Sequence, residues 1–270
     1  MTVVHAAILG LVQGLTEFLP ISSSGHLVLV PAVLGWPEPP LSFLVLLHAG
    51  SLLAVVTYFW RELVQLLFGL FRPGAPRRLV VLLALATLPG ALIGLPLKDV
   101  IEQQFGREEL VALLLMGTGV ILFAADLIER RRPPRGDDEG AGVEELAEAV
   151  TPGRALAIGL AQSVALLPGI SRSGSTIATG LGSGVSRVRA ARFSFLMAIP
   201  AIAGSLAFEV PDLASGRVGG AQMAVGLVVS TITSYAAIGG LIAYLHRRGL
   251  RPFAIYCLVA GAMVFIALTA

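Results

Sequence analysis

The sequence has a single cysteine, Cys257, and few charged residues. One cysteine excludes a disulfide within the chain and any metal site built from several cysteines. Asp, Glu, Lys and Arg make up only 13% of the 270 residues, whereas soluble globular domains contain about 25%. The basic residues are not interleaved with aromatic ones, so no nucleic-acid partner is expected. The chain is therefore not an ordinary soluble domain or a nucleic-acid-binding protein.

Apolar residues dominate the sequence. They make up 56% of it, and the mean hydropathy is +0.85. A helix needs about 20 apolar residues to cross a bilayer, and six stretches approach this length. We therefore predict an all-α polytopic membrane protein whose six full spans are Phe43–Trp60, Leu79–Leu97, Leu110–Ile128, Phe193–Phe208, Ala221–Leu245 and Pro252–Leu268.

Four further apolar runs are shorter and are interrupted by polar residues. Val3–Leu19 stops at Pro20, before a serine cluster, and Leu27–Leu34 follows that cluster. Ala155–Leu167 and Gly174–Leu181 flank a second polar stretch. Each pair reads as a re-entrant helical hairpin that enters the membrane and returns to the same side. Non-helical backbone at that depth is tolerated only where protein or a wet cavity covers it.

The two hairpin sequences repeat at an offset of 149 residues. Gly10–Gln13 matches Gly159–Gln162, and Ile21–Gly25 matches Ile170–Gly174. Each copy contains one hairpin and three spans, so the second copy is inverted relative to the first, an arrangement that places a site near the bilayer midplane. We predict a single membrane domain over 1–270, with repeat one at 1–128, a cytoplasmic linker at 129–153 that holds a short surface helix at Val143–Ala149, and repeat two at 154–270.

The basic residues test this topology independently. In the predicted arrangement, 15 of the 19 lysines and arginines fall on one side, and three, Lys98, Arg107 and Arg217, fall on the other. The positive-inside rule makes the rich side cytoplasmic. Both termini and the first hairpin then belong to the outer side, and the second hairpin enters from the cytoplasm. Only Arg172, within the second polar stretch, is not explained by the topology.

Glu17 is an acid within apolar sequence. Gln13 precedes it by four residues, so the two side chains share one face of a helix. Ionisable residues in the hydrocarbon region usually have a partner and a function. Glu17 is predicted to be a metal ligand, or a carboxylate that accepts a proton or orients water. The alternative is a buried polar contact between packed helices.

Ser22, Ser23, Ser24, Gly25 and His26 are predicted to open a helix. Amides at a helix start, a flexible glycine and several hydroxyls form a cradle for phosphate oxygens. A serine N-cap would explain only one of the three hydroxyls. His26 is either a core histidine with satisfied hydrogen bonds or, as its place in the cradle favours, an acid–base or nucleophilic group. The other three histidines are interpreted as structural.

The second polar stretch is a similar cradle that also contains a guanidinium. Its candidate phosphate-binding residues are Ser171, Ser173, Gly174 and Thr176. The planar fork of Arg172 suits bidentate binding of phosphate at membrane depth. The alternative for this arginine is a loop residue that extends its side chain to the membrane surface.

Together these residues supply an acid, an imidazole, a guanidinium and two hydroxyl-rich cradles within lipid. Phosphoryl transfer needs mainly positioning, neutralisation of phosphate charge and an activated nucleophile. A midplane site open to lipid suits a substrate with a phosphate head and a hydrocarbon tail. The residues therefore predict a lipid-phosphate phosphatase. Inverted repeats with broken helices are also a transporter architecture, so a transporter or flippase of the lipid phosphate is the alternative.

Two long motifs, Gln13–His26 and Pro168–Ile177, occur in the chain, with shorter ones at Ala54–Arg61, Phe193–Leu196 and Pro252–Tyr256. In these stretches the chain resembles the undecaprenyl-diphosphate phosphatase family of the bacitracin-resistance type. The resemblance covers almost the whole chain, and two long motifs in the right order are highly specific. The family residues that carry over are Glu17, Ser23, His26, Ser171, Arg172, Ser173 and Thr176.

The resemblance implies hydrolysis of undecaprenyl diphosphate to undecaprenyl phosphate and inorganic phosphate, which recycles the lipid carrier for cell-wall synthesis and gives bacitracin resistance. It implies a multi-pass protein of the bacterial plasma (inner) membrane whose active site opens to the outer face. The expected cofactor is a divalent cation, Mg²⁺ or Ca²⁺. The expected partners are a polyprenyl diphosphate lipid and membrane lipid, and a homodimer is left open.

One position departs from the family pattern. Where many members have a second glutamate, this chain has Gln13, whose amide can coordinate a cation or orient water but cannot act as a base. Glu17 must then fill any carboxylate role alone, and we expect these two residues to hold the metal. Arg172 and the cation are expected to neutralise the diphosphate. The nucleophile is Ser23, His26 or water.

Overall fold

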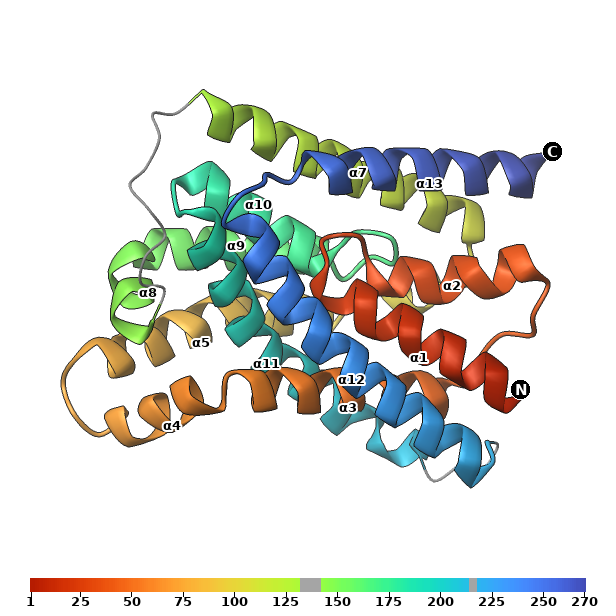
Figure 1. Cartoon of the computed structure of the whole chain (residues 1–270), viewed down its shortest axis with the longest axis horizontal. Coiled ribbons are helices and arrows are strands. Elements are labelled where there is room, and N and C mark those ends of the chain that lie inside the picture. The colour runs from red at the N-terminus through yellow and green to blue at the C-terminus, as the bar shows by residue number, and fades with distance from the viewer. Residues whose placement is uncertain (132–141, 214–217) are drawn as a thin grey trace.

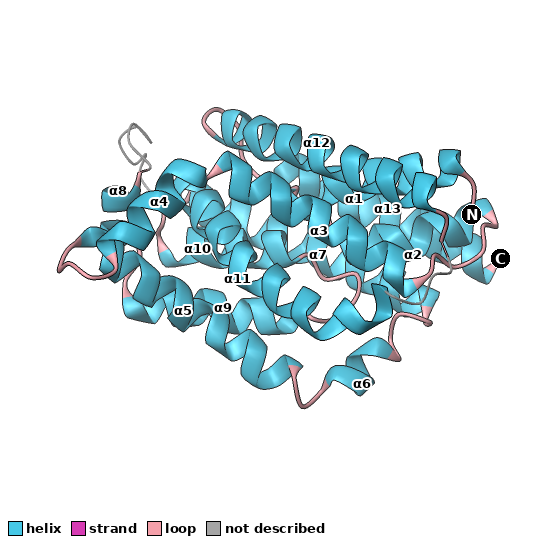
Figure 2. Cartoon of the chain, turned by 90° about the horizontal axis from the view of Figure 1, so that it is seen from below, coloured by secondary structure: helices cyan, strands magenta, loops and turns pink. Residues whose placement is uncertain are grey.

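A computed structural model describes residues 1–131, 142–213 and 218–270 of the chain. Within these ranges every regular element is a helix, as Figure 2 shows. The first copy of the repeat contains α1 (Val3–Phe18), α2 (Ser23–Leu34), α3 (Leu41–Tyr58), α4 (Trp60–Gly69), α5 (Ala75–Gly94), α6 (Lys98–Glu102) and α7 (Glu108–Arg130). The rest of the chain contains α8 (Val143–Ala149), α9 (Pro152–Val164), α10 (Arg172–Ser183), α11 (Arg187–Leu213), α12 (Gly220–Leu245) and α13 (Arg251–Thr269).

Six of these helices are long and apolar enough to cross a membrane: α3, α5, α7, α11, α12 and α13. They correspond one to one with the six predicted spans, so the prediction of an all-α polytopic membrane protein is confirmed. The helices of the two hairpins are shorter, at 16 and 12 residues for α1 and α2 and 13 and 12 for α9 and α10. Their lengths agree with the prediction that none of them is a full span.

The largest boundary error concerns α11, which begins at Arg187 rather than at Phe193. The arginines at its start can stay in the helix because they have partners. The Nε of Arg187 lies 2.6 Å from a carboxylate oxygen of Glu129. Arg192 donates to Glu62, and its guanidinium lies 5.1 Å from the centre of the Phe59 ring. Paired charges of this kind extend the helix beyond the apolar run that marked the predicted span.

Two short helices, α4 and α6, were not predicted, because the sequence there mixes charged and apolar residues without a long run. The predicted helix at Val143–Ala149 is present as α8, although three of its side chains are buried rather than exposed. Part of the predicted linker, residues 132–141, lies outside the described residues, as does Arg217 of the charge count.

The tips of the two hairpins meet near the middle of the molecule, having entered from opposite ends (Figure 1). A Cβ added to Gly25 would lie 3.2 Å from the Cα of Gly169, and one added to Gly174 would lie 3.4 Å from the carbonyl oxygen of Pro20. Pro20 and Gly169 are equivalent positions of the repeat, and so are Gly25 and Gly174. The two tips therefore contact each other reciprocally, and the glycines let the two backbones approach closely.

Equivalent helices also cross in equivalent ways. α1 packs on α12, and α9 packs on α5, the helix that holds the corresponding place in the first copy. A Cβ on Gly10 would lie 2.9 Å from the carbonyl oxygen of Gly226, and one on Gly159 would lie 2.4 Å from that of Ala86. Small residues thus bring both helix pairs close together, as is common in membranes. Both termini lie at one end of the molecule, opposite α8 (Figure 1). The inverted orientation of the copies in a membrane stays a prediction.

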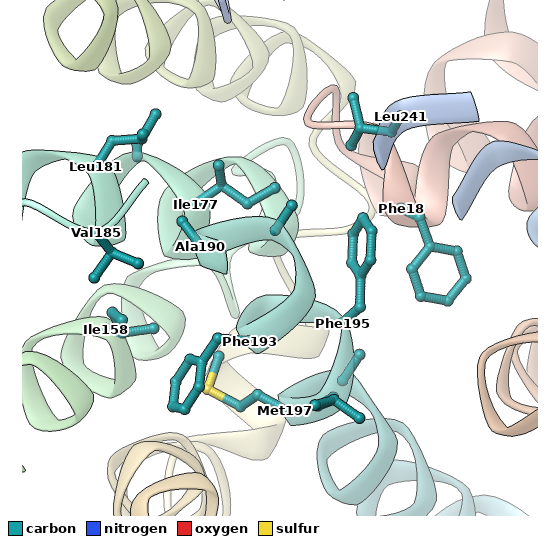
Figure 3. Packing of buried hydrophobic residues seen from close by; sticks show 14 of the residues in the cluster. Phe18, Ile158, Ile177, Leu181, Val185, Ala190, Phe193, Phe195, Met197 and Leu241 are labelled. Atoms are coloured by element: carbon teal, nitrogen blue, oxygen red, sulfur yellow. The ribbon is translucent and has the colours of Figure 1, made fainter. Parts of the chain in front are cut away.

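A buried aromatic contact fixes the end of α1. Phe18 and Phe195 are fully buried, and their rings meet edge to face with centres 5.3 Å apart. Figure 3 shows the two rings side by side in the core. Such contacts add to the free energy gained from burying the rings. Because Phe18 follows Glu17 and Phe195 follows Ser194, this packing also sets the positions of two polar residues described below.

Candidate active site

Glu17 lies at the centre of the polar residues from both hairpin tips. Its Oε1 accepts a hydrogen bond from Nη2 of Arg172 at 2.9 Å. Its Oε2 accepts one from Oγ of Ser23 at 2.5 Å and one from Nε2 of Gln13 at 3.1 Å. Glu17 is only 6% exposed. A buried carboxylate thus receives donors from α1, α2 and α10, and the structure brings these four predicted residues together.

The two short helices α2 and α10 begin at this carboxylate. Ser23 and Arg172 are their first residues, and Ser22 and Ser171 are their N-caps. The Ser22 Oγ accepts a hydrogen bond from the Gly25 amide at 3.2 Å. In the same way, the Ser171 Oγ accepts one from the Gly174 amide at 3.0 Å. Each helix start carries a partial positive charge of about half a unit. Two such starts and a guanidinium around one point stabilise negative charge, and in this structure that charge is the Glu17 carboxylate.

Two residues after each N-cap, Ser24 and Ser173 make equivalent contacts with the capping serine. Oγ of Ser22 lies 3.3 Å from that of Ser24, and Oγ of Ser171 lies 3.2 Å from that of Ser173. Ser173 also donates to the carbonyl oxygen of Leu19 at 2.9 Å, which ties the second tip to the first. This hydroxyl therefore holds the two hairpins together.

Thr176 supports Arg172 from within α10. Its hydroxyl donates to the carbonyl oxygen of Arg172 at 2.7 Å and lies 2.6 Å from the Ser194 hydroxyl of α11. Nη1 of Arg172 donates to the carbonyl oxygen of Ser194 at 3.4 Å. The guanidinium is therefore held from two sides, by Glu17 and by α11.

Exposure divides the predicted phosphate-binding residues into two groups. Ser23, Ser24 and Arg172 are partly exposed, so a ligand can reach them. The remaining members are buried: Ser22, Gly25, Ser171, Ser173, Gly174 and Thr176. Two of their hydroxyls cap helices, one joins the tips, and that of Thr176 contacts α11, while the two glycines pack against the opposite tip.

His26 does not hydrogen-bond to Glu17. Its Nδ1 lies 2.7 Å from the carbonyl oxygen of Ser22, and its Nε2 lies 2.7 Å from the hydroxyl of Tyr256. Ser22 adopts a φ of 70°, which is unusual for a residue other than glycine. This conformation directs its carbonyl toward the imidazole, and strain of this kind often occurs at functional sites. The histidine is joined to the Glu17 network through the backbone of the first tip.

His48 is a neighbour of the site that the sequence did not identify as functional. Its Nε2 lies 3.9 Å from Oε2 of Glu17, while its Nδ1 donates to the carbonyl oxygen of Leu44 at 2.9 Å. Ser51, one turn later on α3, accepts a hydrogen bond from Gln13 at 3.2 Å. The available signal was their spacing of three residues, which places two polar side chains on one face of an apolar span.

Three further residues, which lie outside the two hairpins, hold the hairpin tips in position. Thr118 of α7 accepts from the Ser171 amide and donates to the Gly169 carbonyl, both at 2.9 Å. Ser194 holds Arg172, and Tyr256 of α13 contacts His26. Ser194 and Tyr256 lie in the shorter motifs Phe193–Leu196 and Pro252–Tyr256, but nothing in the sequence indicated which hairpin tip any of the three residues would face.

Gln13 and Glu17 are the residues expected to hold a divalent cation. Oε1 of Gln13 is buried and accepts no hydrogen bond within the described part of the chain. This oxygen and the Glu17 carboxylate are ligands that Mg²⁺ and Ca²⁺ prefer. The described residues contain no group of three His, Cys, Asp or Glu side chains suited to a metal. In this structure Gln13 directs its NH2 group, not this oxygen, to the carboxylate, and a cation held by the two residues stays a prediction.

The comparison with known proteins decides the family. The model of the family described as bacitracin resistance protein BacA matches residues 6–263. The chain belongs to this family. It is 42% identical to an undecaprenyl-diphosphatase of Pelobacter propionicus, in an alignment that covers 100% of this chain and 98% of the relative. It is 41% identical to an undecaprenyl-diphosphatase of Acidiphilium cryptum, with 98% of both chains covered. The family predicted from the motifs is therefore confirmed.

Proposed function

We propose that the chain is an integral-membrane phosphatase that hydrolyses undecaprenyl diphosphate to undecaprenyl phosphate and inorganic phosphate. One observation carries the proposal: Ser23 and Arg172 bind the two oxygens of the buried Glu17 carboxylate, between two helix starts. This arrangement supplies a hydroxyl, an acceptor for its proton and positive charge, which phosphoryl transfer needs. The names of the relatives, which match over the full chain, favour the phosphatase over the flippase.

The partly exposed polar groups of the site bind the substrate. Arg172 and the helix starts of α2 and α10 neutralise the diphosphate, and the hydroxyl of Ser24 donates to its oxygens. The apolar surfaces of the surrounding helices leave the prenyl tail in lipid. The buried serines and Thr176 keep this group of donors in place and do not contact the substrate.

The geometry favours Ser23 as the nucleophile. Its hydroxyl donates to Glu17 at 2.5 Å, so the carboxylate accepts the proton as the serine oxygen attacks the terminal phosphorus. The bond from that phosphorus to the bridging oxygen breaks, and undecaprenyl phosphate leaves. Water then hydrolyses the phosphoserine and releases inorganic phosphate. Both ring nitrogens of His26 already have partners, which makes this histidine a weaker candidate for the attack.

A divalent cation, Mg²⁺ or Ca²⁺, belongs to the proposal. Glu17 and the free amide oxygen of Gln13 would hold it, and when bound it would neutralise charge on the diphosphate. The amide that replaces the second acid contributes no charge, so this chain is expected to bind the ion more weakly than a two-acid site would.

We place the protein in the bacterial inner membrane, with the site open to the outer face. The uneven distribution of 15 basic residues against three supports this orientation. Undecaprenyl phosphate released there returns to cell-wall synthesis, and removal of the diphosphate gives bacitracin resistance.

The proposal is tested by phosphate release from undecaprenyl diphosphate with protein purified in detergent, with and without a chelator. Hydrolysis that stops with the chelator and returns with Mg²⁺ or Ca²⁺ is expected. Arg172→Ala should abolish it, whereas Arg77→Ala, which changes an exposed arginine of α5, should not. Movement of the carrier across vesicles without phosphate release would instead identify a flippase.

A further inference from the structure

Tyr256 is a polar residue of α13 that contacts the active site from the end of the chain. Its hydroxyl lies 2.7 Å from Nε2 of His26. The two rings are almost parallel, with centres 5.7 Å apart and planes 8° apart. The next residue, Cys257, directs its thiol to the carbonyl oxygen of Pro20 at 3.8 Å. Two consecutive residues of α13 therefore hold the first hairpin tip.

The donors and acceptors in this contact can be assigned from chemistry. The Ser22 carbonyl can only accept, so Nδ1 of His26 must carry a hydrogen. In the neutral imidazole Nε2 is then the acceptor, and the Tyr256 hydroxyl is the donor. The tyrosine and the Ser22 carbonyl together fix both the tautomer and the ring orientation of His26.

We infer that Tyr256 is a positioning residue for the proposed reaction. It holds Nε2 of His26, whose Nδ1 in turn holds the Ser22 carbonyl next to the proposed nucleophile Ser23. The Tyr256 hydroxyl can rotate, so it donates to the neutral ring and accepts from the protonated one. The imidazole therefore keeps a partner in both protonation states. The same contact covers Nε2, which separates His26 from the role of phosphoryl acceptor and leaves that role to Ser23. This inference rests on the proposed phosphatase function.

The substitution Tyr256→Phe isolates the hydroxyl, because the ring that stacks on the imidazole is retained. Tyr235→Phe is the matched control: the two tyrosines are similarly exposed, at 44% and 47%, but Tyr235 contacts the Tyr58 ring instead of the site. We expect Tyr256→Phe to lower kcat about five- to tenfold, the effect of one hydrogen bond, with KM within twofold of the unsubstituted protein. Tyr235→Phe should change neither constant.

A spectroscopic measurement tests the contact without relying on activity. In full-length protein labelled with ¹⁵N-histidine, His26 should show a protonated Nδ1 and an unprotonated Nε2 that accepts a hydrogen bond. His26→Gln identifies the signals by their loss. In Tyr256→Phe, the Nε2 signal should move toward the position of a free acceptor, while Nδ1 stays protonated. A purely structural tyrosine would leave Nε2 unchanged.

The outcomes separate this inference from the proposed function. If the unsubstituted protein fails to release phosphate, the proposed function is wrong, and the nitrogen spectrum still tests the contact. If it releases phosphate and Tyr256→Phe matches Tyr235→Phe in kcat and in the Nε2 signal, only the role of Tyr256 is rejected. A protonated Nε2 with an unprotonated Nδ1 in the unsubstituted protein also overturns the inference, even if Tyr256→Phe fails to fold.

Discussion

Ser23 and Arg172 occupy the same position in the two copies of the repeat, and they bind opposite oxygens of one carboxylate. Each is the first residue of its helix, behind a serine N-cap. The position equivalent to Glu17 in the second copy holds Leu166, so the pair shares a single acid. Symmetry of the fold thus places a hydroxyl and a guanidinium face to face, and divergence of the copies gives them different chemistry.

Replacement of Glu17 by Gln should remove the proton acceptor while keeping the shape of the side chain. We expect kcat to fall by at least about 100-fold, the usual contribution of a positioned base. The loss of charge opposite Arg172 should also lower the free energy of unfolding by about 1–3 kcal/mol. Phosphate release and thermal unfolding in detergent measure the two effects.

Glu62→Gln is the control for this substitution, because it removes the acid of another partly buried pair, the one with Arg192. It should lower the melting temperature and leave kcat within about threefold, since Glu62 lies outside the site. Equal losses of kcat in both variants would mean that Glu17 acts only through stability.

Ser23→Ala and Ser24→Ala form a second matched pair. Both serines are partly exposed at the start of α2, but only the Ser23 hydroxyl donates to Glu17. We expect Ser23→Ala to lower kcat by about 1,000-fold or more, as the loss of a nucleophile does, and Ser24→Ala to lower it about tenfold or less. Substrate labelled on the terminal phosphate should leave its label on the unsubstituted protein and not on Ser23→Ala.

The sequence was sufficient to predict the six spans and the two hairpins, because the length of each hydrophobic run shows whether a helix can cross the bilayer. It also predicted one site near the bilayer midplane that draws on residues of both polar stretches, because the repeat is inverted. The pairing of Ser23 with Arg172 around one acid was not predicted, since side-chain contacts depend on how the tips cross. That crossing is set by close packing at Gly25 and Gly174, for which an open cradle was expected.

Single polar residues within spans were beyond sequence analysis. His48 and Thr118 each face a motif that is distant in the chain, and nothing local distinguishes them from structural polar residues. Tyr256 lies in the motif Pro252–Tyr256, but that motif does not indicate its partner His26. Their partners are fixed by which helices pack together, and hydrophobic periodicity does not determine this. Similarly, the N-terminal extension of α11 depends on the partners of Arg187 and Arg192, which come from α7 and α4.

Substitution by glycine should have opposite effects on thermal stability at the two N-cap serines, Ser22 and Ser171. Ser22 adopts a φ of 70°, whereas Ser171 has a φ of −73°. Ser22→Gly relieves about 1–3 kcal/mol of backbone strain, which offsets a few tenths of a kcal/mol of capping and about 0.5–1 kcal/mol of backbone entropy. Ser171→Gly loses the same capping and adds about 0.5–1 kcal/mol of backbone entropy. Thermal unfolding should show the first variant at or above the unsubstituted protein and the second below it; the reverse order would exclude strain at Ser22.

Gln13→Glu should increase the affinity of the site for a divalent cation. It supplies a second carboxylate four residues before Glu17 on the same face of α1. Because affinity rises with ligand charge, the Mg²⁺ or Ca²⁺ concentration for half-maximal phosphate release should fall about tenfold. Isothermal titration with the metal alone checks the same shift without turnover. An unchanged metal affinity would remove Gln13 from the cation site.

The crossing of α9 with α5 gives a test of the packing on which the whole site depends. A Cβ at Gly159 would lie 2.4 Å from the carbonyl oxygen of Ala86, so the helices must separate to accept Gly159→Ala. We expect a loss of about 1–3 kcal/mol in the free energy of unfolding, as for other overpacked contacts. The shift of α9 would move the tip that carries Arg172, so kcat should fall as well. Gly153→Ala, on the same helix with open space around it, should instead stabilise the protein by about 0.5–1 kcal/mol. If the two variants behaved alike, close packing of α9 would not position the second tip.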